Sequence, residues 1–198
     1  MKDIQAVFDS SESSSGGKVA FVPTPEGVYP SHVSDFTVND YKGSKVFNLS
    51  FTIADEASKL DVPKLVSDGN GGWMQDVDGS GKAVSAKAGF MVGNSYRSDK
   101  GVWLTPNPAK GESWKNKRYK EYFENLRVSF PEGDDGTVSL AEVEREDVIG
   151  QPCLINLKQT SFTNKEGETR TAMKVVAVHN WKDGEVLSAE ELSADVPF

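Results

Sequence analysis

Residues 45–53 read Lys-Val-Phe-Asn-Leu-Ser-Phe-Thr-Ile, and from the third position onward large apolar side chains alternate with polar ones. The apolar members of this pattern are Phe47, Leu49, Phe51 and Ile53. Successive side chains of a β-strand point to opposite faces, so the pattern predicts a strand with one buried face and one wet face. Residues 28–38 form a similar run, and turn-forming residues fill positions 39–43. The two runs are therefore predicted to pair as a hairpin.

Three further strands are predicted. We place the third over residues 87–92, after a long loop with two Gly-rich segments, 69–72 and 76–81. The fourth covers residues 153–157, where apolar side chains alternate with polar ones. The fifth covers residues 173–181, which are apolar enough on both faces to form a central or covered strand.

Two helices are predicted between the third and fourth strands. From Ser113 to Leu126, apolar side chains recur at helical spacing, with Ser113 as the expected N-cap. The apolar residues are Tyr119, Tyr122, Phe123 and Leu126. A shorter helix is expected to begin at Ser139, where the spacing is that of a capping box, and to end before Gly150.

This order of elements predicts a mainly β protein. We expect a five-stranded OB-fold barrel over residues 18–182, with a helix between strands 3 and 4 and long inserted loops. Residues 1–17 end in a Ser- and Gly-rich run and are expected to form a flexible N-terminal arm. Residues 183–198 are expected to form an acidic C-terminal tail that interacts with other proteins.

Composition sets limits on location and chemistry. At 198 residues and 37% hydrophobic content, the chain is long enough for one domain with a core. No apolar run reaches membrane-spanning length, and residues 1–15 lack the basic and apolar regions of a secretion signal, so we expect a cytoplasmic protein without a membrane partner. The single cysteine, Cys153, excludes an internal disulfide and is expected to be buried.

The sequence gives little support for an enzyme. It contains two histidines, no nucleophile elbow and no phosphate-binding loop, so no catalytic residue, cofactor or metal is predicted. Residues 76–81 imitate the start of a calcium-binding loop. Lys87 stands where such a loop needs a bidentate Glu, which favours a hairpin turn.

Charge is distributed unevenly along the chain. The net charge is −8, but residues 183–198 hold five acidic residues and no Lys or Arg, which leaves −3 for residues 1–182. Residues 96–120 hold seven basic residues against two acidic ones. Four of the cations fall within residues 115–120, where we expect a positive field that neighbouring carboxylates do not neutralise.

The last four residues are Asp195, Val196, Pro197 and Phe198. A terminal phenyl ring can fill an apolar pocket on a partner while its carboxylate meets a cation there. The alternative is a polar terminus that happens to stop at Phe.

This tail resembles those of single-stranded DNA-binding proteins of bacteria and their phages, which end in Asp-Ile-Pro-Phe or a close variant. Residues 7–180 also resemble a group of phage replication proteins. The segments that carry this similarity are 7–9, 25–30, 47–49 and 148–155. The resemblance implies an OB fold that binds single-stranded DNA during replication or recombination, with replication or recombination proteins recruited by the tail and a possible homo-oligomer.

In such proteins, bases stack on exposed rings while Lys and Arg follow the phosphates. OB folds place these groups on strands two and three and on two of the loops. The predicted DNA-binding residues are Tyr41, Lys42, Lys45, Trp73, Tyr96, Arg97, Lys100, Trp103, Trp114, Lys115, Lys117, Arg118, Phe162, Lys165 and Arg170.

Some aromatic residues have competing roles. Phe47, Phe51, Tyr122 and Phe123 are assigned to the core, whereas packing and stacking are equally open for Trp103 and Trp114. A structural role is favoured for His179 and Trp181. The rival function is that of a non-enzymatic β-rich phage structural or adaptor protein that does not bind DNA.

Overall fold

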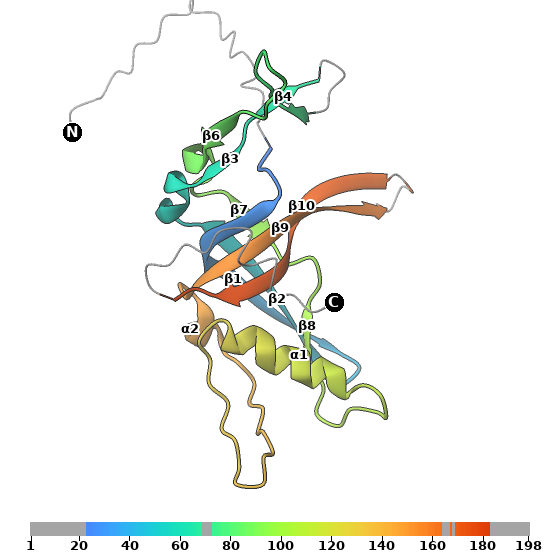
Figure 1. The fold of residues 1–198 in the computed structure, drawn as a ribbon. Helices are drawn as coiled ribbons and strands as arrows, with labels where there is room; N and C mark the ends of the chain where they lie inside the picture. Colours follow the sequence, from blue (N-terminus) through green and yellow to red (C-terminus); the bar gives the residue numbers. More distant parts are fainter. Residues whose placement is uncertain (1–22, 69–72, 164–166, 168, 183–198) are drawn as a thin grey trace, which may run out of the picture.

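The computed structural model describes residues 23–68, 73–163, 167 and 169–182, and it is mainly β (Figure 1). The N-terminal arm and the acidic tail expected from the sequence lie outside the described residues. The elements are, in order, β1 (Gly27–Tyr41), β2 (Ser44–Ile53), η1 (Asp55–Lys59), β3 (Asp61–Pro63), β4 (Leu65–Ser67), β5 (Trp73–Gln75), β6 (Ser85–Lys87), η2 (Ala88–Met91), β7 (Ser95–Arg97), β8 (Val102–Leu104), α1 (Ser113–Glu124), α2 (Arg145–Val148), β9 (Pro152–Thr163) and β10 (Thr169–Asn180).

Six strands form one antiparallel sheet in the order β10-β9-β1-β2-β7, with β8 also paired to β2. The predicted hairpin is confirmed as β1 and β2, which pair from Ser31 opposite Ile53 to Tyr41 opposite Ser44. The fourth and fifth strands are confirmed as β9 and β10. Two small two-stranded sheets, β3 with β6 and β4 with β5, form a projecting module at the top of Figure 1.

The described strands do not close into a barrel, so the five-stranded OB-fold barrel expected from the sequence is not confirmed. Among the described residues, a single parallel bridge between Ser98 and Val175 joins the β7 side of the sheet to β10. The amide of Asp99 donates to the carbonyl of Val175 at 2.9 Å beside this bridge. Because β7 is only three residues long, no ladder continues along this seam.

The third strand expected over residues 87–92 is wrong. Residues Ala88–Met91 form the 3-10 turn η2, with Ala88 and Met91 both buried. Three residues complete one turn of a 3-10 helix, so these two side chains reach the core from the same side. Strands β7 and β8 pair with β2 instead.

The predicted long helix is confirmed as α1, but its cap differs. Glu112 is the N-cap, and Ser113 is already the first helical residue. The short helix α2 begins at Arg145 instead of Ser139. Its capping box is formed by Glu144 and Asp147. Ser139, the predicted start, lies instead in an extended arm over residues 129–139, which is closed by a β-bridge between residues 132 and 138. Among the described residues, no helix is long and apolar enough to cross a membrane.

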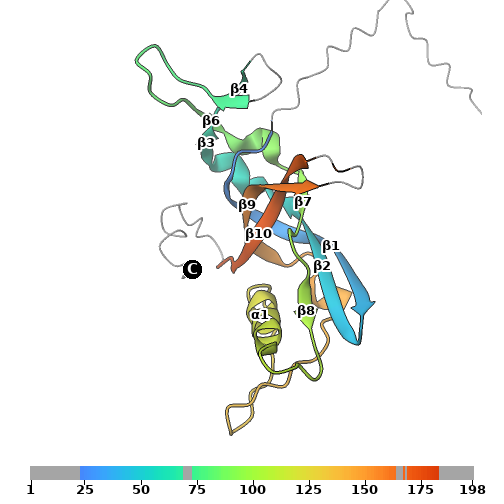
Figure 2. The ribbon, with the colours of Figure 1, turned by 90° about the vertical axis from the view of Figure 1, so that its right-hand side faces the viewer.

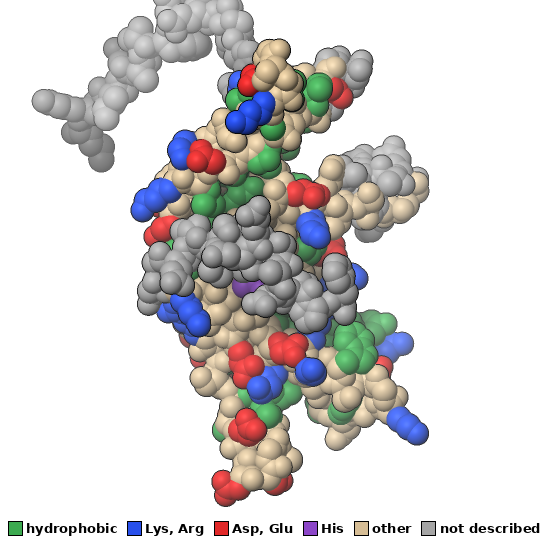
Figure 3. Space-filling model, in the orientation of Figure 1, with side chains coloured by type: hydrophobic (Ala, Val, Ile, Leu, Met, Phe, Trp, Pro, Cys, Tyr) green, Lys and Arg blue, Asp and Glu red, His purple; other side chains and the backbone are tan. Residues whose placement is uncertain are grey.

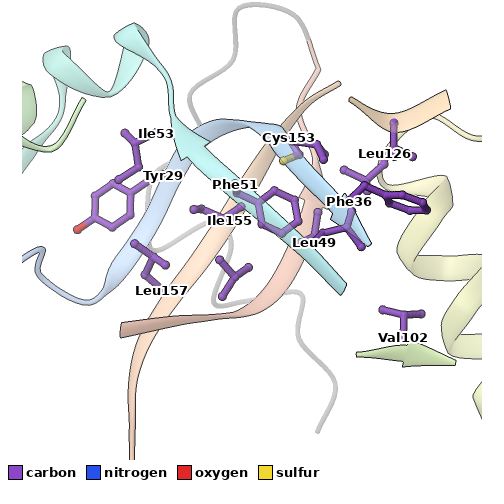
Figure 4. Packing of buried hydrophobic residues seen from close by; sticks show 14 of the residues in the cluster. Tyr29, Phe36, Leu49, Phe51, Ile53, Val102, Leu126, Cys153, Ile155 and Leu157 are labelled. Atoms are coloured by element: carbon purple, nitrogen blue, oxygen red, sulfur yellow. The ribbon is translucent and has the colours of Figure 1, made fainter. Parts of the chain in front are cut away.

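The core runs along one face of the sheet, from η1 and η2 at one end to α1 at the other (Figure 4). Phe47, Leu49, Phe51 and Ile53 are all buried, as their alternation predicts. Tyr119 and Phe123 bring α1 onto this face, and the ring centroid of Phe47 lies 5.2 and 5.6 Å from theirs. Cys153 is also buried, as expected, and this burial raises the pKa of its thiol.

Burial of tyrosine gives the fold a predicted alkaline limit. The fully buried Tyr119 has its pKa raised to about 12, chiefly by desolvation, and burial also raises the pKa values of Tyr29 and Tyr122. Above pH 10 the unfolded chain loses these phenol protons while the folded chain keeps them, so stability falls as pH rises from about 10 to 12. We expect the urea midpoint to be lower at pH 11 than at pH 9. An unchanged midpoint would contradict this prediction.

Candidate nucleic-acid interface

A pocket of about 310 Å³ opens where β8 meets the N-terminal turn of α1. Its lining residues are Lys100, Gly101, Trp103, Trp114, Lys115 and Arg118. All but the glycine were predicted from sequence to contact DNA. On the face seen in Figure 3, hydrophobic side chains and Lys or Arg side chains adjoin at the lower right, over the right-hand end of α1. We refer to this pocket as the basic aromatic cleft.

Strand register places Trp103 in the cleft. Val102 lies opposite Phe47 and is buried, so the next residue, Trp103, lies opposite Val46 on the other face of the strand. The Tyr41 ring packs edge-on against Trp103, with 5.7 Å between ring centroids. Trp103 therefore combines packing with a partly exposed surface.

Two positions beside Trp103 depend on close contacts. A side chain at Gly101 would run into Val46, so only glycine fits this approach of the chain to β2. The amide of Asn116 in α1 accepts from the backbone N–H of Thr105 at 2.9 Å and donates to its carbonyl at 2.8 Å. These bonds fix the start of α1 against the end of β8. Neither residue was singled out from sequence, since the contact depends on tertiary structure.

Helix α1 presents the other half of the cleft. Tyr119 and Phe123 anchor one side of the helix in the core, and Trp114, Lys115 and Arg118 line the cleft from the first turns. The Trp114 side chain is 55% exposed, which is unusual for an indole. An exposed ring on a rigid helix is available for stacking.

The expectation of an unneutralised field on α1 is wrong for three of its four cations. Carboxylates of α1 or of its N-cap residue pair with them. The nitrogen-to-oxygen distances are 2.8 Å for Lys115 with Glu112, 3.7 Å for Lys117 with Glu121, and 2.8 Å for Lys120 with Glu124. Such exposed pairs are weak and are screened by salt.

The pair nearest the cleft is Lys115 with Glu112. The hydrogen bond from Lys115 holds the pKa of the Glu112 carboxyl below its ordinary value. The same ammonium lies 5.4 Å from the ring centroid of Trp103. Lys100 and Arg118 form no ion pair with the described residues, so each side of the cleft presents one cation that these residues leave unpaired.

Several other predicted residues are placed elsewhere. Lys45 pairs with Glu142 at 2.5 Å, and its hydrogen bond to that carboxylate raises its pKa. The Tyr96 hydroxyl is hydrogen-bonded to Thr24, and its ring packs partly buried against the core. Arg97 is exposed on β7, away from the cleft lining.

The loop candidates are divided among several places. Lys42 follows β1 at the hairpin tip, where its ammonium lies 5.4 Å from the ring centroid of Tyr41. Trp73 starts β5 and lines a different pocket, between the projecting module and β9–β10. Phe162 and Arg170 face each other in the β9–β10 ladder, but their side chains lie outside the described residues. Lys165 also lies outside them, as do tail residues 195–198.

Within the described part of the chain, no group of His, Cys, Asp and Glu side chains could hold a metal ion. The calcium-like segment 76–81 forms a turn, as predicted. The Asp78 carboxylate accepts hydrogen bonds from the Ser80 amide at 2.8 Å, the Ser80 hydroxyl at 2.6 Å and the Lys82 amide at 3.0 Å. These bonds lower its pKa.

A scan of the chain against models of protein families finds no matching family. A search of curated proteins finds no similar sequence at a significant level.

Proposed function

We propose that this protein binds single-stranded DNA with little sequence preference and protects it during phage DNA replication or recombination, in the host cytoplasm. The observation that carries the proposal is the basic aromatic cleft, where two indoles and three cations line one open pocket. Bases stack on aromatic side chains irrespective of their identity, and cations beside the rings meet the phosphates. Two aromatic rings with cations beside them suit a flexible single strand, because its bases can turn outward and stack on the rings.

The connectivity of the sheet supports an OB-type fold as part of this proposal. Its strands run β7-β2-β1-β9-β10, and the one link between the β7 side and β10 is parallel. An OB fold is a partly open five-stranded Greek-key barrel whose strand 2–3 face and loops bind oligonucleotides. The cleft lies where β8 pairs with β2, the equivalent of that face. In the same proposal, the acidic residues 183–198 recruit replication or recombination proteins.

The proposal predicts a salt-dependent titration. Adding oligo(dT) should quench Trp emission, and salt should reverse the quenching with a slope of about 0.7 in log K for each phosphate contacted. A Lys100→Ala and Arg118→Ala double variant should have a slope shallower by about 1.4.

A Lys59→Ala and Lys82→Ala double variant is the matched control, because it removes two exposed cations that lie outside the basic aromatic cleft and form no ion pair with the described residues. It should keep the wild-type slope. Absence of quenching with oligo(dT) would reject the proposal and favour the structural or adaptor protein. Equal affinity for duplex of the same sequence would also reject it.

A further inference from the structure

A second pocket lies outside the basic aromatic cleft, between the projecting module and the β9–β10 hairpin. Its volume is about 670 Å³, within the range of ligand-binding pockets. Residues that line it include Pro25, Pro63, Trp73, Gln75, Gln159 and Met173. We refer to it as the module pocket.

Two strand pairs face each other across the module pocket. In β5, Trp73 and Gln75 are two residues apart and share one face, with Leu65 of β4 opposite Gln75. In the main sheet, Gln159 of β9 lies opposite Met173 of β10. All five residues line the pocket. The pocket thus has an indole, a thioether and two amides that can donate and accept hydrogen bonds.

The charge of the module pocket selects its occupant. No Lys or Arg is among the described residues that line it. Among those residues the one charged side chain is that of Glu26, whose carboxylate accepts a hydrogen bond from the backbone N–H of Gln159 at 2.8 Å. Among the described lining residues, a phosphate or a carboxylate group would meet one anion and no cation. The occupant that fits is an uncharged planar group that stacks on Trp73 and uses amide hydrogen bonds.

The module pocket lies close to the proposed DNA path. Met173 lines it, and two residues further along β10 Val175 bridges to Ser98. Two residues beyond Ser98, Lys100 lines the basic aromatic cleft. The Cα atoms of Met173 and Lys100 are therefore within about 20 Å of each other. In the view of Figure 2, β4, β10 and β8 follow one another from top to bottom.

We infer that the module pocket is a second base-stacking subsite, which takes an unpaired nucleobase of the strand whose phosphates and other bases occupy the basic aromatic cleft. The inference rests on the proposed function. It makes binding depend on strand length, because a short strand reaches one subsite and a longer one reaches both. Its hydrogen-bonding amides also give this subsite the means to prefer some bases over others.

The test compares full-length Trp73→Ala with Trp114→Ala on strands of about 4 and about 16 nucleotides, which span the site sizes of OB folds. Trp73→Ala should leave the affinity for the short strand unchanged and weaken the long strand about five- to a hundredfold. Trp114→Ala should weaken both. Trp73→Phe, which keeps a ring, should restore most of the long-strand affinity.

A second test varies the DNA and uses the wild-type protein as its reference. One abasic position moved along the long strand should lower wild-type affinity in two separate regions, and Trp73→Ala should abolish the effect in one of them. If the wild type binds the long strand but shows a single sensitive region, or if Trp73→Ala weakens both strands equally, the second subsite is rejected and the proposed function stands. If the wild type binds neither strand, the proposed function is rejected, and the second subsite with it.

Discussion

Replacing both Trp103 and Trp114 by Ala is expected to weaken binding of single-stranded DNA by about 2 to 6 kcal/mol. The figure follows from about 1 to 3 kcal/mol for each base that stacks on an aromatic side chain. It corresponds to at least a thirtyfold rise in Kd. Both indoles line the basic aromatic cleft, so their loss removes its stacking surface while its cations stay. Fluorescence anisotropy of a labelled oligo(dT) at one fixed salt concentration measures the effect.

Phe90→Ala is the matched control for this double variant. Phe90 is 46% exposed on η2, which follows β6, so its removal deletes an exposed ring outside the cleft lining. The single variants are informative as well. Trp103 also contacts Lys115 and Tyr41, so its loss should disturb the neighbours of Trp114 and make the two effects non-additive. A folded double variant with wild-type affinity would show that these rings only pack.

Alternation and helical periodicity predicted the parts of the fold that local sequence controls. In β2 every second side chain is buried without interruption, because strand geometry leaves no other arrangement once one face meets the core. In α1 the apolar spacing gave both the element and its buried face. The hairpin β1–β2 followed from turn residues placed between two such runs.

The elements that the sequence misplaced depend on contacts distant in the chain. The local sequence of residues 88–91 predicts a strand. In the structure these residues form a 3-10 turn that brings Ala88 and Met91 into the same core, a contact that the local sequence does not indicate. The length of β7 limits how many residues can pair between this side of the sheet and β10, and the local sequence does not determine that length. The helical ion pairs could have been found, since Lys117–Glu121 and Lys120–Glu124 have the i, i+4 spacing of exposed helical pairs.

The sequence predicted which residues form the candidate site better than it predicted where those residues lie. Residues 96–120 stood out because rings and cations are dense there, and five of these aromatic and basic residues do line one cleft. Tyr96 and Arg97 belong to the same segment, but β7 carries them to another part of β2. The module pocket joins residues from five separate strands, so no local pattern indicates it.

The position of the cleft depends on an aromatic cluster beneath it. Phe47 is fully buried, and its ring centroid lies 5.8 Å from Phe36, 5.2 Å from Tyr119 and 5.6 Å from Phe123. It also lies opposite Val102 in the β2–β8 pairing. The same side chain therefore supports β8 and α1, which carry the two indoles of the cleft.

Phe47→Ala is expected to lower the free energy of unfolding by about 3 to 5 kcal/mol, because it leaves a cavity where three rings lose their common contact. In a protein of this size the loss corresponds to a fall in Tm of about 6 to 20 °C. Thermal unfolding followed by circular dichroism measures it. Phe90→Ala, which deletes a half-exposed ring, should shift Tm by no more than a few degrees. A Phe47→Ala shift no larger than that of Phe90→Ala would mean that this cluster does not hold β8 against α1, and the arrangement of the cleft would then need another cause.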